Sequence, residues 1–210
     1  MVQRDYIVRI IEQFAAFLWA IIFNKKIRNY DIALEKIEEA YNELLNSKSN
    51  KIKSLEVDEI VKSNTYEKVL NTDNIEIIAN LLSEEADIIE QINGLNRITS
   101  EYYQKSFVLF YVLANKMNTR KHDEKIDEII SKLNDYELID ETRYKIYEYY
   151  EEKGLYGKAE DKLYELKEDN YPNITNTIKI FYERMLEKDN ETLEKGNLPR
   201  NEILEEMDKL

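Results

Sequence analysis

The sequence predicts an all-α protein of about ten helices, in which antiparallel helix hairpins pack against one another. Apolar residues recur every three to four positions along most of the 210 residues, which is the spacing of a helix that packs on one face. Only 4 Gly and 2 Pro occur, too few for the many turns of a β architecture. The polar connections are short, so successive helices are expected to be neighbours.

The first expected helix covers residues 6–23 and is apolar over much of its circumference. Its main stripe contains Tyr6, Ile7, Ile10, Ile11, Phe14, Phe17, Leu18, Ile21 and Ile22. A second stripe on a neighbouring face contains Ala16, Trp19 and Phe23. A helix with two apolar faces needs cover on more than one side. We expect Trp19 and Phe23 to be buried against later helices of the same chain, with a dimer interface or contact with a membrane surface as the alternatives.

The further helices follow from apolar spacing and from start and stop signals. They are expected at about residues 30–46, 55–63, 72–93, 100–117, 121–133, 140–153, 156–167, 174–188 and 199–207. Asn71 starts one of them, and Thr99 or Ser100 is expected to cap the next. Asp140 is expected to cap the helix at about residues 140–153, and Gly94 is expected to end the helix at about residues 72–93.

The whole chain, residues 1–210, is expected to form a single domain. The best candidate for a break lies near residues 47–54, where the polar stretch Ser47–Lys53 is expected to be an exposed loop. No other stretch has a composition that separates two domains.

Small residues recur where the two helices of a hairpin would cross. In the clearest case Gly154 ends an aromatic helix, Tyr156 follows, and Ala159 comes three residues later. This resembles the tetratricopeptide hairpin, and the stretch Tyr30–Ala33 repeats it. The residues expected at close crossings are Ala33, Ala86, Ala159 and Ser106. We therefore expect the hairpins to stack as a tetratricopeptide-like, right-handed α-solenoid with a concave groove.

Four stretches are similar to a bacterial protein family of unknown function and of about this length. The opening Arg4–Gln13 and the tail Gly196–Glu202 are the most specific, and Ala33–Ile37 and Tyr156–Ala159 add to them. The resemblance spans nearly the whole chain. It implies a tetratricopeptide-like helical fold and no reaction, so it carries over no functional residue.

The side chains that enzymes and metal sites use are nearly missing from the sequence. With no Cys there is no thiolate zinc site and no cysteine nucleophile, and the 1 His cannot form a multi-histidine site. His122 stands among charged residues and is interpreted as solvated. The neighbours Glu84 and Glu85 should point to different sides of a helix, and Gly154 with Gly157 is interpreted as a helix-end turn. We expect no catalytic, cofactor-binding or metal-binding residue.

The charge of the chain limits its partners and its location. It has 43 acidic and 30 basic residues and a net charge of −13, which disfavours binding to a nucleic-acid backbone. Residues 1–30 differ, with five basic and two acidic residues. The longest uncharged apolar run is the ten residues of Phe14–Phe23, about half of a bilayer crossing. A cytoplasmic location is expected, and association with a membrane is disfavoured.

The leading hypothesis for the function is a non-enzymatic interaction protein or scaffold that binds a basic or polar peptide in an acidic concave groove. Aromatic residues supply the candidate partner surface, which comprises Trp19, Phe23, Tyr102, Tyr111 and Tyr149. Packing in the core is the preferred interpretation for most of the tyrosines. A second hypothesis is a self-associating structural protein that dimerises through its first helix. A third is an enzyme or small-molecule carrier with a pocket between helices.

Overall fold

The computed structural model describes the backbone of residues 2–210 and the side chains of residues 8–210. This part of the chain is 76% helical, with 12 helices, 10 of them of 7 residues or more, and one short two-stranded hairpin. The prediction of an all-α fold is confirmed. The predicted stripe residues Tyr6 and Ile7 lie outside the described side chains. The chain divides into two compact units, residues 1–137 and 138–210, and each is described by itself.

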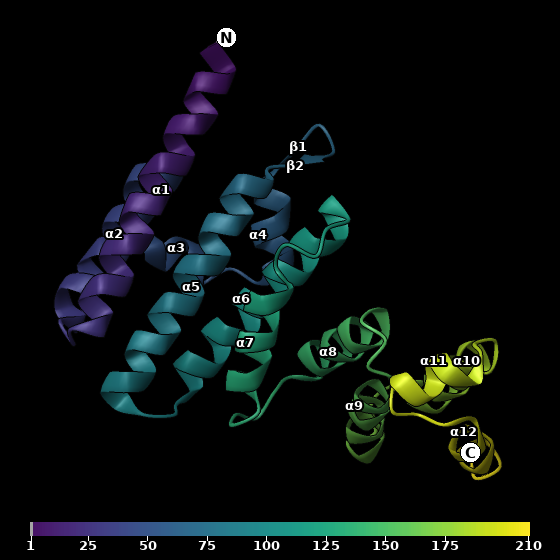
Figure 1. The fold of residues 1–210 in the computed structure, drawn as a ribbon. Coiled ribbons are helices and arrows are strands. Elements are labelled where there is room, and N and C mark those ends of the chain that lie inside the picture. The colour runs from purple at the N-terminus through teal and green to yellow at the C-terminus, as the bar shows by residue number, and fades with distance from the viewer. Residues whose placement is uncertain (1) are drawn as a thin grey trace. The chain divides into compact units, whose positions relative to one another are not determined.

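Unit 1 is built on two helix hairpins (Figure 1). Its elements are α1 (Val2–Lys26), α2 (Tyr30–Leu45), α3 (Ser49–Lys53), α4 (Val57–Ser63), β1 (Thr65–Tyr66), β2 (Val69–Leu70), α5 (Thr72–Asn93), α6 (Arg97–Met117) and α7 (Asp123–Leu133). Helix α1 pairs with α2, and α5 pairs with α6. Both helices of the first hairpin contact α5, and α7 packs on α6. Helix α5 is therefore the element that joins the parts of this unit.

The ends of α5 follow the predicted signals, whereas α6 begins earlier than predicted. The Asn71 side chain accepts a hydrogen bond from the Asn74 amide over 3.1 Å, and Gly94 ends α5 with a φ of 71°. The cap of α6 is Asn96, not Thr99 or Ser100. Asn96 accepts from the amide of Thr99 over 3.1 Å, and the Thr99 hydroxyl accepts from the Asn96 amide. This is a capping box, so Thr99 takes part in the cap from the third helical position.

The expected exposed loop at residues 47–53 is wrong, because this stretch contains helix α3. Ser49 and Ile52 of α3 are buried, and the Ser49 hydroxyl donates to Glu38 on α2. The compact units divide after Glu137 and not near residue 47. The organisation of residues 1–210 as a single domain stays a prediction.

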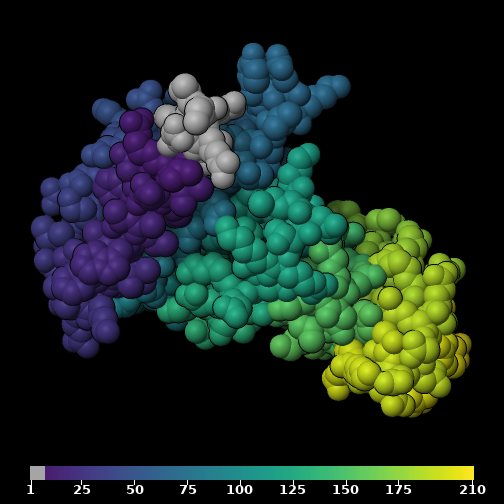
Figure 2. Space-filling view, turned by 45° about the horizontal axis from the view of Figure 1, so that its top comes forward, coloured from purple at the N-terminus to yellow at the C-terminus, as the bar shows by residue number. Residues whose placement is uncertain are grey.

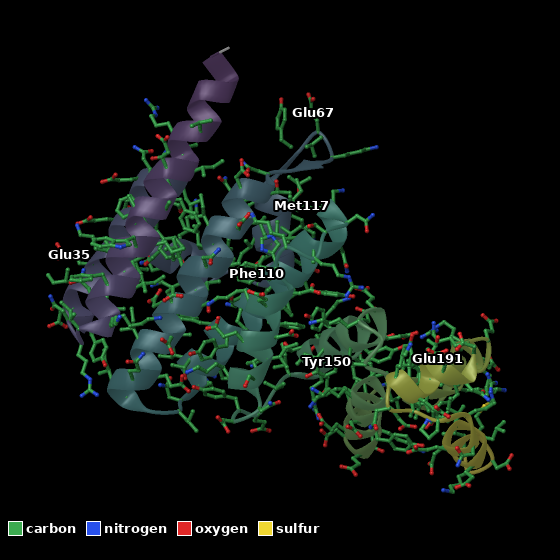
Figure 3. The ribbon with its side chains drawn as sticks, in the orientation of Figure 1. Glu35, Glu67, Phe110, Met117, Tyr150 and Glu191 are labelled. Carbon is green, nitrogen blue, oxygen red and sulfur yellow. The ribbon has the colours of Figure 1, made fainter. Side chains whose placement is uncertain are left out.

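The core of unit 1 lies between its helices, and small residues occur at the helix contacts. Ala33, Ala86 and Ser106 are fully buried, and the Ser106 hydroxyl donates to the carbonyl oxygen of Ala79 over 2.7 Å. Phe110, labelled in Figure 3, is buried among the helices of this unit. A larger side chain at the small positions would push the helices apart, since protein interiors are close-packed.

Unit 2 consists of five helices (Figure 1). They are α8 (Asp140–Glu152), α9 (Tyr156–Glu168), α10 (Ile174–Leu186), α11 (Asn190–Lys195) and α12 (Arg200–Met207). Helices α8 and α9 form a hairpin, and α10 packs on α9 and α12. The predicted cap Asp140 is instead the first residue of α8, after Ile139. Its carboxylate pairs with Arg143 one turn further on. The stacking of the hairpins into a right-handed solenoid stays a prediction.

The C-terminal tail of unit 2 packs against the preceding helices of the same unit. Leu193, Leu198 and Ile203 are fully buried. Arg200 donates to the carbonyl oxygen of Leu186 over 3.0 Å and to that of Lys188, so a cation lies at the C-terminal end of α10, where the helix dipole is negative. The tail thus closes the core of this unit.

Candidate partner surface

Helix α1 has one covered and one uncovered apolar face. On the covered face Ile21 is fully buried. The side chains of Ile10, Phe14, Phe17 and Leu18 are half-buried on the same side. The uncovered side, called here the outer face of α1, consists of Val8, Ile11, Glu12, Ala15, Ala16, Trp19, Ile22, Phe23, Lys26 and Ile27, all of them exposed. The outer face continues along the helix as one stripe because its members recur at three- and four-residue steps.

Trp19 and Phe23 lie at the centre of the outer face, and their expected burial within the chain is wrong. Trp19 is 67% exposed and Phe23 is 45% exposed. Their rings stack with centroids 5.2 Å apart and planes 8° apart. Helices α2 and α5 contact α1 only from its covered side, and Figure 2 shows α1 at the surface of unit 1. Two stacked aromatic rings are thus left in water, which is unfavourable unless something covers them.

The orientation of the outer face is fixed from the opposite side of the helix. Lys25 extends from α1 to α5, where its Nζ lies 2.9 Å from Asp87 and also contacts Glu84. Burial of Lys25 acts to lower its pKa, but the two carboxylates outweigh this and its pKa is raised. The ion pair and the buried Ile21 hold α1 by its inner side. The outer face of α1 therefore has a fixed orientation toward solvent.

Besides the exposed Arg9 near its start, the outer face carries a carboxylate toward one end and a lysine toward the other. Glu12 lies one heptad before Trp19, and Lys26 lies one heptad after it. Neither has an ion-pair partner among the side chains of residues 8–210. Between the charges, Ala15 and Ala16 leave a low stretch one turn before the bulky Trp19. A partner of the outer face would therefore have to match both the order of its charges and the sizes of its side chains.

The three candidate tyrosines lie elsewhere. Tyr111 is 4% exposed and Tyr149 is 3% exposed, so the structure places both in the core, as the preferred interpretation of the tyrosines predicts. Tyr102 is half-buried on α6, and the Nζ of Lys53 lies 5.8 Å from its ring centroid. Of the five predicted surface residues, the structure brings together only Trp19 and Phe23. A partner role for Tyr102 stays a prediction.

Helix α5 carries a row of carboxylates whose burial the sequence analysis missed. Glu84 and Glu85 are buried, and they point to different partners, as their adjacency predicts. Glu85 contacts Lys53 of α3 over 2.8 Å, and Glu84 contacts Lys25 of α1. Burial raises the pKa of Glu85 in spite of the opposing charge of Lys53.

These carboxylates tie other elements to α5. Lysines from α1, α3 and α7 converge on it, and no group of three carboxylate or imidazole side chains among the described residues could hold a metal ion. Because the acids face lysines of neighbouring elements, their arrangement serves packing. A lysine at each of these positions cancels a charge that would be costly to bury alone.

His122 is buried, so its interpretation as a solvated residue is wrong. It is 5% exposed, and its ring lies 5.4 Å from that of Phe110. Burial lowers its pKa, although Glu76 acts in the opposite direction. The imidazole is therefore neutral near pH 7. A neighbouring nucleophile, which its use in catalysis would require, is absent from the described contacts of its ring.

Unit 2 contains a cleft of about 570 Å³ between α8 and α10. Tyrosines line it together with Arg184. The Nε and one terminal nitrogen of Arg184 each lie 2.8 Å from Glu151, and the same terminal nitrogen donates to the Tyr147 hydroxyl. Arg184 and Glu151 thus satisfy each other and leave no unpaired charge between them, while Glu148, Glu152 and Lys188 also line the cleft.

One protein family matches the chain over residues 1–210. The chain belongs to DUF6483, a family of unknown function. Neither a curated protein nor a solved structure matches the chain. Membership of DUF6483 confirms the predicted relation to a family without assigned function, and it gives no reaction, substrate or partner.

One stretch that suggested the family has a structural role in this member of DUF6483. The tail Gly196–Glu202 lies against the start of α9, where the Gly157 amide donates to the carbonyl oxygen of Gly196 over 2.9 Å. Gly157 is therefore a contact position inside α9 and not part of a helix-end turn, whereas Gly154 has the φ of 75° that such a turn requires. The contacts of this tail serve packing within unit 2. The outer face of α1 therefore remains the candidate site.

Across the helices of this DUF6483 member that the structure describes, none has both the length and the apolar character needed to cross a membrane.

Proposed function

We propose that the protein is a non-enzymatic interaction module and that the outer face of α1 binds an amphipathic helix of a polypeptide partner. The observation that carries the proposal is the exposure of Trp19 and Phe23 at the centre of this face. Burial of a large apolar side chain stabilises a complex by about 1.5–3 kcal/mol. A partner that covers both rings and the neighbouring isoleucines would gain several such contributions.

A helix is the occupant that the shape of the outer face favours. From Val8 to Lys26 the stripe extends for about 27 Å at 1.5 Å per residue. A second helix can lie along such a stripe when the two helices pack at a shallow angle. The low stretch at Ala15 and Ala16 next to Trp19 can accept a bulky side chain from the facing helix.

The charges on the outer face favour a polypeptide over a lipid surface. Glu12 lies within the stripe, and a carboxylate is repelled by anionic lipid head groups. A peripheral membrane helix instead carries its charges on the face opposite its apolar residues. The separated pair of Glu12 and Lys26 matches a partner helix with a cation and an anion at the same spacing.

Other features support an interaction protein over an enzyme. The buried carboxylates of α5 are engaged by lysines, and Arg184 in the unit 2 cleft is engaged by Glu151. We include in the proposal the tetratricopeptide-like character of the hairpins, which the full burial of Ala33 and Ala159 supports. It also includes the cytoplasmic location that the charged composition favours. The acidic groove for a basic peptide stays a prediction from the sequence.

Photo-cross-linking in cells tests the proposal. A photoreactive benzoyl-phenylalanine is placed at position 19 of the full chain, and at position 66 as the control, since Tyr66 is also exposed but lies on the β-hairpin. We expect an adduct from position 19 only, whose cross-linked peptide, identified by mass spectrometry, comes from an amphipathic helix. A phospholipid adduct, no adduct, or the same adduct from both positions contradicts the proposal.

A further inference from the structure

We infer that the helix that covers the outer face is α1 of a second copy of this chain. The two helices run antiparallel, and a two-fold axis passes beside Trp19. The inference rests on the proposed function, because it names the partner of the same surface. Three independent features of the outer face support it: the placement of its charges, the sizes of its side chains, and its position in the charge distribution of the chain.

The charges on the outer face match those of a second copy in this arrangement. In an antiparallel two-fold pair, a residue lies opposite the partner residue that is equally far beyond the axis. Glu12 precedes Trp19 by seven residues, and Lys26 follows it by seven. Each Glu12 therefore faces Lys26 of the partner subunit, and the dimer contains this ion pair twice. Both charges lack an ion-pair partner within the described side chains of one chain.

The side-chain sizes match in the same register. Ala15 precedes Trp19 by four residues and Phe23 follows it by four, so a methyl group faces a ring. Ala16 and Ile22 are placed in the same way at three residues from the axis. Large residues opposite small ones let two helices interdigitate without voids.

Further out, Ile11 and Ile27 face each other at eight residues from the axis. This apolar contact lies beyond the ion pair of Glu12 and Lys26 on each side. It shields the pair from water, which strengthens the attraction between the two charges.

Other arrangements of two copies are less favourable. A parallel pair places each Glu12 beside the other Glu12, and each Lys26 beside the other Lys26. It also places Phe23 opposite Phe23 and Ile22 opposite Ile22, whereas the antiparallel pair has one contact of this kind, between the two Trp19 rings at the axis. A shift of the antiparallel axis by one helical turn moves Glu12 and Lys26 out of register, so that neither charge faces an opposite charge of the other copy. The parallel pair is disfavoured because like charges in contact repel.

The charge distribution of the chain favours contact through α1. Two copies that each carry a net charge of −13 repel each other. Residues 1–30 contain five basic and two acidic residues, so a contact through α1 does not bring the strongly acidic remainders of the two copies together. The N-terminal end of α1 also extends beyond the end of α2 (Figure 1), which leaves the outer face open to a second helix.

Charge reversal tests the register. Sedimentation equilibrium of the full chain at tens of micromolar measures the dimer dissociation constant for wild type, Glu12→Lys, Lys26→Glu and the variant with both changes. Each single variant places two like-charged pairs in the seam, and we expect its dimer to be weaker by about tenfold or more. The double variant restores both ion pairs in reversed order, and we expect its dissociation constant to return to within about threefold of wild type.

The control and a second readout separate this effect from misfolding. Glu35→Lys makes the same charge change on the outer side of α2 (Figure 3) and should leave the dimer unchanged. Helix content by circular dichroism should be equal for all variants. Trp19 is the only tryptophan in the sequence, so the tryptophan fluorescence reports on the seam alone. Its emission should shift to shorter wavelength when the wild type dimerises and should not shift in the single variants.

Each other outcome overturns the inference. A monomeric wild type, or a double variant as weak as the single ones, excludes this antiparallel seam. If wild type is monomeric but position 19 cross-links to an amphipathic helix of a different protein, the proposed function stands and the second copy is excluded. If wild type is monomeric and binds phosphatidylglycerol vesicles through Trp19, both proposals fail.

Discussion

The amide of Gly157 donates a hydrogen bond over 2.9 Å to the carbonyl oxygen of Gly196, and the two backbones meet without intervening side chains. A β-carbon on Gly196 would lie 2.1 Å from the ring of Tyr156, and one on Gly157 would lie 2.5 Å from the carbonyl oxygen of Asn197. Both distances are well below van der Waals contact. The start of α9 and the tail of unit 2 can approach this closely because both positions are glycine.

Gly196→Ala should therefore destabilise unit 2. Gly196 has a φ of −80°, which alanine adopts freely, so the cost comes from the overlap with Tyr156 and not from backbone strain. We expect a loss of about 1–3 kcal/mol in the free energy of opening of α9 and α12, measured by hydrogen exchange with mass spectrometry. Glu191→Ala, at an exposed site in α11, is the control and should change exchange little. Equal protection in Gly196→Ala and wild type would contradict the close contact.

Tyr182→Phe should destabilise unit 2 by leaving a buried carboxylate without its donor. Tyr182 is fully buried, and its hydroxyl donates to Glu160, which is also buried. Burial raises the pKa of Glu160, and the hydrogen bond from Tyr182 opposes this rise. We expect a loss of about 1–3 kcal/mol in urea unfolding at neutral pH. Tyr171→Phe, which keeps a half-buried ring stacked on Tyr144, is the matched control. A similar stability of the two variants would show that Glu160 does not need the donor.

Tyr41→Phe should behave in the opposite way, although Tyr41 is as buried as Tyr182. The Tyr41 hydroxyl has no hydrogen-bond partner among the described residues. Removal of an unsatisfied buried hydroxyl relieves a desolvation cost, so we expect no loss beyond about 0.5 kcal/mol in urea unfolding, or a gain. A loss as large as that of Tyr182→Phe would contradict the assignment of this hydroxyl as unsatisfied.

Asp87 should make the stability of unit 1 depend on pH in the acidic range. It contacts Lys25 over 2.9 Å and Lys132 over 3.1 Å. Burial acts to raise its pKa, but the two lysines outweigh burial, and the pKa is lowered from its ordinary value of 3.8. As the pH falls the unfolded chain takes up this proton first. The ion pairs thus contribute fully above the ordinary pKa, and their contribution is lost as the pH falls through the lowered pKa.

Asp87→Asn should accordingly lower the free energy of urea unfolding at neutral pH, and its difference from wild type should shrink below about pH 4. Circular dichroism at several pH values measures this. Glu35→Gln changes the same charge at an exposed site on α2 and should show a smaller difference at neutral pH. A difference between Asp87→Asn and wild type that grows toward acidic pH would contradict the assigned direction.

The sequence predicted the long helices well because their signals are local. The period of α5 and its ends at Asn71 and Gly94 can be recognised within a few residues. Helix α3 was missed because five residues are too short for a period to emerge. Asn96 was missed as the cap of α6 because Thr99 is an equally good capping residue three positions later.

The candidate site could be predicted only in part, because exposure depends on packing between distant segments. The two apolar faces of α1 are visible in the sequence, but which of them α2 and α5 cover is not. For the same reason the sequence does not show which tyrosines reach the surface, and the candidates Tyr111 and Tyr149 are both buried. His122 was placed in solvent because its sequence neighbours are charged, and its burial against Phe110 comes from α6.

The docked tail has a consequence for the biosynthesis of this protein. Leu198 completes the core of unit 2 and Arg200 covers the end of α10, so unit 2 cannot close until both residues have left the ribosome. The carboxylates of α5 form ion pairs with lysines that precede α5 in the chain and with lysines on α7, and all of these residues lie within residues 1–137. Unit 1 of a nascent chain can therefore fold first. Chains that end near residue 195 would leave the surface of α9 uncovered and accessible to cellular proteases.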